Sequence, residues 1–395
     1  MDTSGVGGRI ATKRKLAGLK QTQLAQKATY SVSLVRAVEQ GREPASPGFI
    51  AAVARALGIE PEQLTGTPYR DTIEEDGPLE GMAELRTILA EGPYVRAVEP
   101  EPDTPAAMTA ELDHMYVLYQ SDKGRQALKR LPVVIRQLHG ALHAATTDTE
   151  RAQIFSLLSI AYVTAERLCR RFGFMSLTTP AVDRLEWAAH QADDPLYVAQ
   201  AKIKRCRILM YLDSTDVGLS LVEQGLDIIK GGDEPALALR GNGHLCGAIA
   251  AARGRKLDVA RAHLEEARKL ALRMNGESDA YGTLFGPANV GIHSCAVEME
   301  AGDPGKAARE GSALHLPRQI APPRAGHHWQ DTARAWLLSG QPGKALDALN
   351  TARRVATQQT RLHPGVRETL RGIAAAERRR TESLSSFVDW VGLKL

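Results

Sequence analysis

Residues 18–41, GLKQTQLAQKATYSVSLVRAVEQG, decide how the N-terminal part of the chain folds. Apolar residues recur at helical spacing on both sides of residues 28–30, which predicts two short helices joined by a tight turn. Ser31 is placed to cap the second helix, and Gly41 is placed to end it. Two such helices form a helix-turn-helix pattern, in which the second helix enters the major groove of DNA.

The same periodicity continues outward and predicts a compact, all-helical domain over residues 1–66. A first helix is expected at residues 9–17 and two more helical patterns follow residue 41, which makes five short helices. Residues 1–70 hold ten Lys or Arg against five Asp or Glu, whereas the rest of the chain holds 40 against 41. The net charge of +4 therefore comes from this small segment, as expected of a nucleic-acid-binding module on a neutral body.

Residues within 7–66 stand at the spacing of a known family: Leu19, Gln21, Leu24, Ala25, Ser31, Val35, Glu39, Gln40, Gly41, Ala54, Leu57 and Gly58. In these positions the segment resembles the xenobiotic-response-element (XRE) family of helix-turn-helix regulators, which includes the lambda and 434 repressors. The turn departs from the family pattern, because Thr29 stands where the family usually has glycine. We therefore expect a strained or slightly reshaped turn.

The resemblance also implies roles for individual side chains. Gln21 is expected to contact a DNA phosphate, and Arg14 and Glu39 are expected to form an ion pair between the first and third helices. The implied base-reading positions are Val32, Ser33, Leu34, Arg36 and Ala37, and the further phosphate candidates are Lys13, Lys15 and Arg42. Arg36 leads because its planar fork can bond O6 and N7 of guanine; a phosphate contact or a surface salt bridge is the alternative.

Residues 67–105 read as a linker with one short helix, because prolines, glycines and acidic residues interrupt the helical periodicity on both sides of residues 80–90. From residue 106 to residue 395 every long segment has helical periodicity, and no strand pattern stands out. The sequence therefore predicts an all-α protein with a DNA-binding domain at 1–66, a linker at 67–105 and a larger helical domain at 106–395.

Three segments of the larger domain, residues 218–229, 260–271 and 345–356, repeat one pattern. Their columns are small (Gly218, Ala260, Ala345), large and apolar (Val222, Leu264, Leu349), and small again (Gly225, Ala267, Ala352), and a weaker copy begins at Ala307. The pattern resembles the second helix of tetratricopeptide (TPR) repeats. It predicts a divergent TPR-like α-solenoid of helical hairpins, in which small residues let neighbouring helices approach closely.

Carried back to the first helix of each hairpin, the same register aligns small residues at Cys206, Ala248, Cys295 and Ala333. Six residues earlier it aligns a polar column, Gln200, Asn242, Asn289 and His327, with Lys204 and His293 one turn further on and Arg324 beside His327. In TPR-like solenoids such positions line the concave surface, so we predict an effector groove formed by Gln200, Lys204, Asn242, Asn289, His293, Arg324 and His327. The alternative is that these amides cap or bridge neighbouring helices.

Several other functions and environments are not indicated by the sequence. No Cys-x-x-Cys pair occurs, and His139 and His143 have no third ligand at suitable spacing, so no metal site is expected. Phosphate-cradling, nucleophile-elbow and His-Glu-x-x-His motifs are also lacking, so we expect no catalytic residue and no cofactor. No secretory signal and no apolar run of roughly 18 residues occurs, so we expect a cytoplasmic protein without a membrane span.

The two parts together are similar to the peptide-responsive (RRNPP-type) regulators of Gram-positive bacteria and to the helix-turn-helix plus TPR regulators of actinomycetes. This resemblance implies a transcriptional regulator that binds double-stranded DNA, with an inverted-repeat operator and a homodimer as the expected arrangement. The solenoid is expected to bind a peptide or small-molecule effector, to mediate dimerisation, or both. The alternative is a DNA-binding adaptor whose solenoid is a protein–protein scaffold without a small ligand, and an enzyme is not expected.

Overall fold

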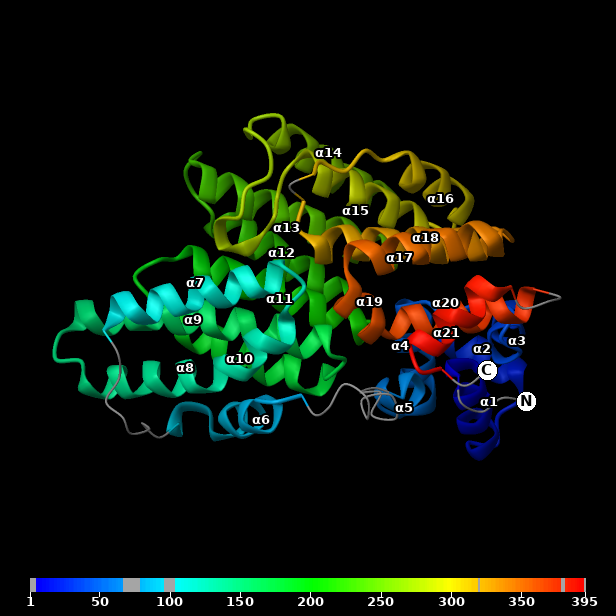
Figure 1. The fold of residues 1–395 in the computed structure, drawn as a ribbon, viewed down its shortest axis with the longest axis horizontal. Helices are drawn as coiled ribbons and strands as arrows, with labels where there is room; N and C mark the ends of the chain where they lie inside the picture. The colour runs from blue at the N-terminus through cyan, green and yellow to red at the C-terminus, as the bar shows by residue number, and fades with distance from the viewer. Residues whose placement is uncertain (1–4, 67–78, 96–103, 319, 378–380, 394–395) are drawn as a thin grey trace.

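The computed structural model describes residues 5–66, 79–95, 104–318, 320–377 and 381–393. Over these ranges the chain is built from helices, and β pairing is limited to one isolated antiparallel bridge between Ser278 and Phe285. The predicted all-α class is confirmed. Figure 1 shows the helices of the larger domain stacked in a curved array, with the N-terminal domain at the end where the C-terminal helices lie. A membrane span would need a longer apolar helix than any in the described ranges.

The N-terminal domain, called the head below, consists of the five helices expected from its sequence. They are α1 (Val6–Leu16), α2 (Gln21–Ala28), α3 (Val32–Glu39), α4 (Pro47–Leu57) and α5 (Glu62–Thr65). Their inner faces share one apolar core that includes Ile10, Leu24, Val35, Phe49 and Leu64. The head therefore has a core of its own, separate from the core of the larger domain.

The larger domain, called the body below, continues with helices to the C-terminus. They are α6 (Met82–Glu91), α7 (Pro105–Gln120), α8 (Gly124–Ala144), α9 (Asp148–Arg171), α10 (Thr178–Ala189), α11 (Leu196–Tyr211), α12 (Thr215–Ile228), α13 (Glu234–Arg253), α14 (Leu257–Ala271), α15 (Pro287–Glu300), α16 (Pro304–Ala313), α17 (Pro322–Leu338), α18 (Pro342–Val355), α19 (Thr357–Leu362), α20 (Pro364–Ala376) and α21 (Glu382–Trp390). Three short 3₁₀ segments, η1 (Gly92–Tyr94), η2 (Met175–Leu177) and η3 (Ala280–Gly282), lie between them.

Successive helices from α9 to α18 pack in pairs as hairpins, which confirms the helical-repeat architecture. The small-residue columns lie where the two helices of a hairpin meet. A Cβ atom at Gly218 of α12 would lie 3.1 Å from Cys206 Sγ of α11, and one at Gly225 would lie 3.2 Å from the Ala199 carbonyl oxygen. The columns are therefore small because larger side chains would separate the paired helices.

The helix α6 lies in the segment expected to be a linker, of which residues 67–78 and 96–103 are outside the described residues. It packs against α8 and α10. Met82, Leu85 and Ile88 are buried in the same apolar cluster as the first helices of the body. The helix predicted between the two domains is thus packed on the body.

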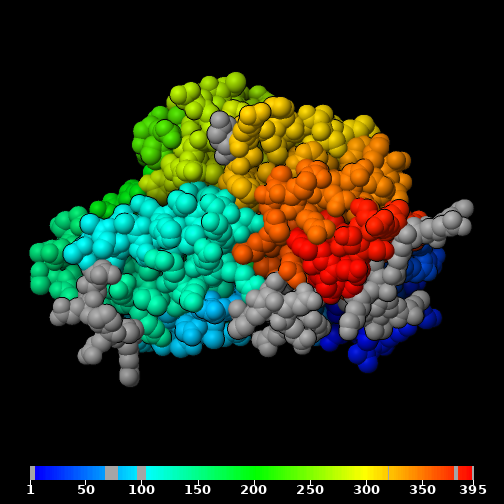
Figure 2. All heavy atoms as spheres, viewed as in Figure 1, coloured from blue at the N-terminus to red at the C-terminus, as the bar shows by residue number. Residues whose placement is uncertain are grey.

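The apolar core of the body is divided along the array into three main clusters. The first lies among α6–α10, the second among α11–α15, and the third among α17, α18, α20 and α21. Figure 2 shows the surface coloured along the chain, and the head, in blue, lies beneath the C-terminal segments, in red. This division follows from the repeat architecture, in which each hairpin packs mainly on its neighbours.

Candidate functional site

The pair α2 and α3 is built by short-range interactions that the sequence specifies. Ser31 caps α3, because its Oγ accepts a hydrogen bond from the Leu34 amide at 3.2 Å. At the other end Gly41 has φ +70°, a left-handed conformation that glycine adopts without steric cost. The two helices therefore begin and end at the residues that the helix-turn-helix pattern indicates.

The outer face of α3 carries the predicted base-reading residues. Ser33 and Arg36 are exposed, Val32 and Leu34 are half-buried against the core of the head, and Ala37 is buried at 7% exposure. A surface hollow on this face is lined by Ser31, Ser33, Leu34, Arg36, Ala37, Arg42 and Glu43. Of the phosphate candidates, Lys15 and Arg42 are exposed, and Lys13 donates to Gln63 Oε1 at 2.7 Å. Arg36 is thus the long charged side chain that α3 presents to solvent.

A buried ion pair joins α1 to α3. Arg14 donates from Nε and Nη2 to the two carboxylate oxygens of Glu39 at 2.6 and 2.7 Å, and from Nη1 to the Leu19 carbonyl at 2.8 Å. Hydrogen bonding to Glu39 raises the pKa of Arg14 above its ordinary value. Gln21 Nε2 donates to the same carboxylate at 2.8 Å, so one of its two amide hydrogens is used inside the head.

The turn between α2 and α3 holds Thr29 at φ 57° and ψ 36°, in the left-handed region. That conformation costs a non-glycine residue about 1–2 kcal/mol, while glycine loses about 0.5–1 kcal/mol more backbone entropy on folding. We therefore expect Thr29→Gly to stabilise the head by roughly 0.5–1 kcal/mol. Slower amide hydrogen exchange in α2 and α3, measured by mass spectrometry, would report it. Thr22→Gly, at an exposed helical position, is the control, and it should speed amide hydrogen exchange in the head. Equally faster exchange in both variants would contradict the prediction.

The body contacts the head at the turn itself. Arg255, which follows α13, donates from Nη2 to the Thr29 carbonyl at 2.9 Å, and its guanidinium lies 5.0 Å from the centroid of the Tyr30 ring. Arg55 of α4 forms an ion pair with Asp213, which follows α11. At the other side of the head, the Val6 amide donates to Glu368 of α20 at 3.2 Å. The position of the helix-turn-helix is therefore tied to two separate parts of the helical array.

In the interior of the body, two members of the predicted polar column hold a loop of the chain itself. Gln200 Nε2 donates to the Tyr281 carbonyl at 2.7 Å, and Asn289 Nδ2 donates to the Leu284 carbonyl at 2.8 Å. The same loop packs Phe285 on Gly241 of α13, where a Cβ atom would lie 2.1 Å from the ring. Gln200 and Asn289 thus hold this loop by hydrogen bonds to its backbone carbonyls.

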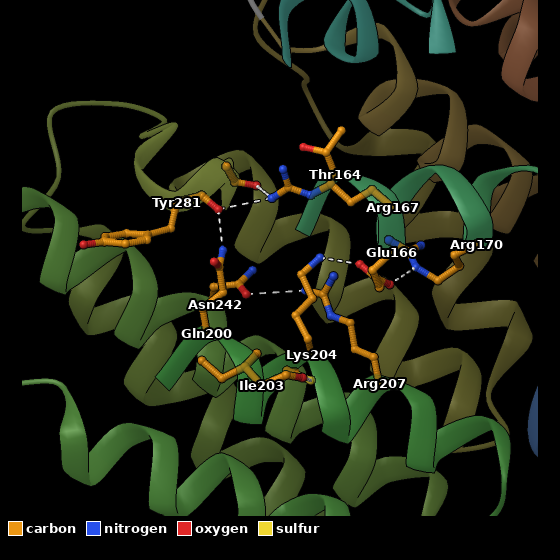
Figure 3. Close-up of polar contacts among 12 residues, drawn as sticks. Thr164, Glu166, Arg167, Arg170, Gln200, Ile203, Lys204, Arg207, Asn242 and Tyr281 are labelled. Carbon is orange, nitrogen blue, oxygen red and sulfur yellow. Dashed lines mark hydrogen bonds and ion pairs between the residues drawn. The ribbon is translucent and has the colours of Figure 1, made fainter. Parts of the chain in front are cut away.

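Lys204 belongs to a buried ion-pair network that joins α11 to α9. Its Nζ lies 2.6 Å from Glu166 of α9, and Arg170 donates to the same carboxylate at 2.9 Å (Figure 3). Burial alone would raise the pKa of Glu166, but Lys204 and Arg170 hold it well below the ordinary value. Burial, together with the nearby arginines Arg167 and Arg207, lowers the pKa of Lys204. Glu166 is therefore an ionised carboxylate enclosed by cations.

The other predicted groove residues lie around this network. Asn242 Oδ1 accepts a hydrogen bond from Arg207 at 3.4 Å, and His327 lies 3.5 Å from Asp331. His293 Nδ1 lies 2.9 Å from the Asn289 carbonyl, and burial lowers its pKa to about 3. Arg324, in the first turn of α17, is half-buried. Within the described ranges, no group of three or more His, Cys, Asp or Glu is arranged to hold a metal ion.

Comparisons with known proteins address the head directly. Residues 6–65 match the family model described as a helix-turn-helix domain. The head is a helix-turn-helix domain. Among solved structures, the chain is similar to Bacillus thuringiensis PlcR in complex with the peptide PapR7 and DNA, at 13% identity over 87% of this chain and 99% of that chain, with a TM-score of 0.35. It is also similar to the TPR domain of P58(IPK), at 16% identity over 95% and 99% of the two chains, with a TM-score of 0.24. No curated protein matches the chain.

The body also contains candidate functional residues that the alignment of the repeats did not identify. Glu166, Arg167 and Arg170 lie on α9, which precedes the aligned hairpins, and Arg207 lies one turn beyond Lys204 on α11. One local indication of this network was present in the sequence. Glu166 and Arg170 stand four residues apart, the spacing of an ion pair on one helix, inside an arginine-rich run. Sequence alone did not indicate that this run faces α11.

Proposed function

We propose that the protein is a sequence-specific, DNA-binding transcriptional regulator that acts in the cytoplasm as a homodimer. The observation that carries this proposal is the exposed Arg36 on α3, the second helix of the helix-turn-helix domain. One such domain buries too little surface for tight specific binding, so the proposal places two copies on half-sites about 34 Å apart, one turn of DNA.

The body in this proposal binds an effector, a peptide or a small molecule, and thereby changes the DNA affinity of the head. Support comes from the polar interior, where Asn242, His293, His327 and Arg324 lie near the ion-pair network. Gln200 and Asn289 hold the loop of residues 278–285 in place and are assigned a supporting role. An effector can shift DNA affinity only as far as it binds the two states differently. The body is thus assigned a binding role and no catalytic one.

Arg36→Ala tests whether α3 reads bases. Loss of a bidentate guanine contact is expected to cost about 1–3 kcal/mol, which is roughly a 5- to 150-fold loss of affinity for the operator. Binding to random DNA should fall much less, because it depends on phosphate contacts. The measurement is fluorescence anisotropy at fixed salt on an operator recovered by genome-wide mapping and on a shuffled duplex. Two chains per operator duplex are expected in the same complexes.

Arg42→Ala is the matched control, since it removes the same charge from an exposed position beside the same hollow. It is expected to weaken binding to both duplexes equally, as a phosphate contact would. If Arg36→Ala also weakens binding to the operator and to the shuffled duplex equally, Arg36 does not read bases. The main support for sequence-specific binding is then lost.

A further inference from the structure

Cations from three helices lie near one another in the interior of the body, and three of them surround the carboxylate of Glu166. The cations are Arg167 and Arg170 of α9, Lys204 and Arg207 of α11, and Arg324 of α17. Figure 3 shows Lys204 reaching from α11 to Glu166 on α9, with Arg170 bonded to the same carboxylate and Arg207 directed toward Asn242. Glu166 pairs with Lys204 and Arg170. With Lys204 counted as charged, five cations stand against Glu166 and, near Arg324, Glu277, which leaves a formal excess of three positive charges.

The pairing is uneven within the cluster. Arg167 donates to the carbonyls of Tyr281 and Gly282 at 3.1 and 2.7 Å, and so it is satisfied by the loop. Arg207 donates to the neutral Asn242 at 3.4 Å. Among the described residues, the Arg324 guanidinium has no hydrogen-bond acceptor and no ion pair within contact distance. Glu277 lies near enough for Arg324 to oppose the rise that burial causes in the pKa of that carboxyl. Arg207 and Arg324 therefore have no carboxylate of the described ranges at ion-pair distance.

The nearby acidic groups outside α9 have hydrogen-bond or ion-pair partners of their own. Glu277, near Arg324, accepts a hydrogen bond from the Ala288 amide at 2.7 Å, and burial raises its pKa. Glu300 pairs with Arg253 at 3.0 Å, and Asp331 lies beside His327. Asp279 accepts a hydrogen bond from Tyr116 at 3.0 Å. The excess positive charge thus remains at the meeting point of α9, α11 and α17.

Neighbouring groups register this positive field. Burial lowers the pKa of Arg324, and Arg207, Arg170 and Arg167 lower it further, to about 10. Burial should raise the pKa of Tyr119, yet nearby Arg171, Arg170 and Arg167 bring it below its ordinary value. A phenol whose anion is favoured in spite of burial lies in a strongly positive environment.

Buried charges of one sign are costly unless an opposite charge accompanies them. Guanidinium groups present planar forks that match the oxygens of phosphoryl and carboxylate groups, and such charge-assisted bonds are among the strongest available. We propose that Arg170, Arg207 and Arg324 together bind an oxyanion of charge two or more, a phosphoryl group or paired carboxylates carried by a small-molecule effector. This inference rests on the proposed function only in calling that anion the effector.

Isothermal titration calorimetry of the full chain tests the site with two probes, sodium pyrophosphate and sodium citrate, against potassium chloride at matched ionic strength. The two probes distinguish a phosphoryl from a carboxylate preference. Wild type is expected to bind at least one of them at low-millimolar concentration. Arg324→Gln and Arg207→Gln are each expected to weaken that binding at least about tenfold.

Arg309→Gln is the matched control, because Arg309 is an exposed arginine on the neighbouring helix α16. It should bind the probe as wild type does. Without any anion, Arg324→Gln is expected to melt at the wild-type temperature or above, since it removes an unpaired cation from a crowded cluster. A merely structural arginine would instead lower the melting temperature when removed.

Three results would overturn the inference: no binding of either probe to wild type, equal loss in Arg309→Gln and Arg324→Gln, or a lower melting temperature for anion-free Arg324→Gln. Operator binding by wild type, measured in parallel, separates this outcome from a failure of the proposed function. Operator binding without probe binding would support the proposed regulator and contradict the anion site. Probe binding without operator binding would support the anion site and contradict the proposed regulator.

Discussion

Glu166→Gln is expected to destabilise the body by about 3–5 kcal/mol, because it removes one partner of a buried ion pair and leaves the other uncompensated. The side chain of Glu166 is 1% exposed, and Lys204 and Arg170 both bond to it. Glutamine has nearly the same size, so the packing change is small and the lost charge dominates. Thermal unfolding followed by circular dichroism measures the effect as a large fall in the melting temperature of the body.

Glu265→Gln provides the comparison, since Glu265 also pairs with an arginine, Arg268, but on the outer surface of α14. Exposed pairs contribute about 0–1 kcal/mol, so this variant should melt close to wild type. Adding Lys204→Met to Glu166→Gln should recover part of the lost stability, because a buried pair removed as a whole costs less than a broken one. A small effect of Glu166→Gln alone would show that the charge of Glu166 is not needed among these cations.

Glu39→Gln is expected to unfold the head selectively. Arg14 and Glu39 are 8% and 6% exposed, and losing the carboxylate leaves the guanidinium buried without its partner, at a cost of about 3–5 kcal/mol. That cost approaches the whole stability of a small domain, which is of order 5 kcal/mol. DNA binding should be lost, while the thermal transition of the body stays in place.

Glu60→Gln is the control in the head, because Glu60 is exposed. Its DNA binding and hydrogen exchange should match those of wild type. If the amides of the head are as well protected from hydrogen exchange in Glu39→Gln as in Glu60→Gln, the ion pair between α1 and α3 does not hold the head together.

The head could be predicted closely because its determinants are local. Ser31, Gly41 and the spacing of apolar residues fix α2 and α3 within a few residues of sequence, and the departure at Thr29 appears in the structure as a left-handed turn. The roles of Gln21 and of the residues on α3 remain predictions, since they depend on DNA. The contact of Arg255 with the turn had no signal, because it joins residues far apart in the chain.

In the body, the repeat columns predicted which helices pair but not what fills the space between them. Small residues such as Gly218 indicate close packing between the two helices of one hairpin, and they carry no information about more distant parts of the chain. The loop at Tyr281 reaches Gln200 and Arg167 from a distant part of the chain, and no periodic pattern contains it. The ion pair of Glu166 with Lys204 was missed for the same reason, because it joins α9 to α11.

The division of the body core into three apolar clusters has a consequence for cooperativity. Clusters that share little apolar surface can open in separate steps, so we expect the body to unfold less cooperatively than a domain with a single core. Arg170 lies on a helix of the first cluster, Arg207 on a helix of the second, and Arg324 on a helix of the third. If an anion binds there as proposed, it would link helices of all three clusters, and we expect them to unfold together when the site is occupied.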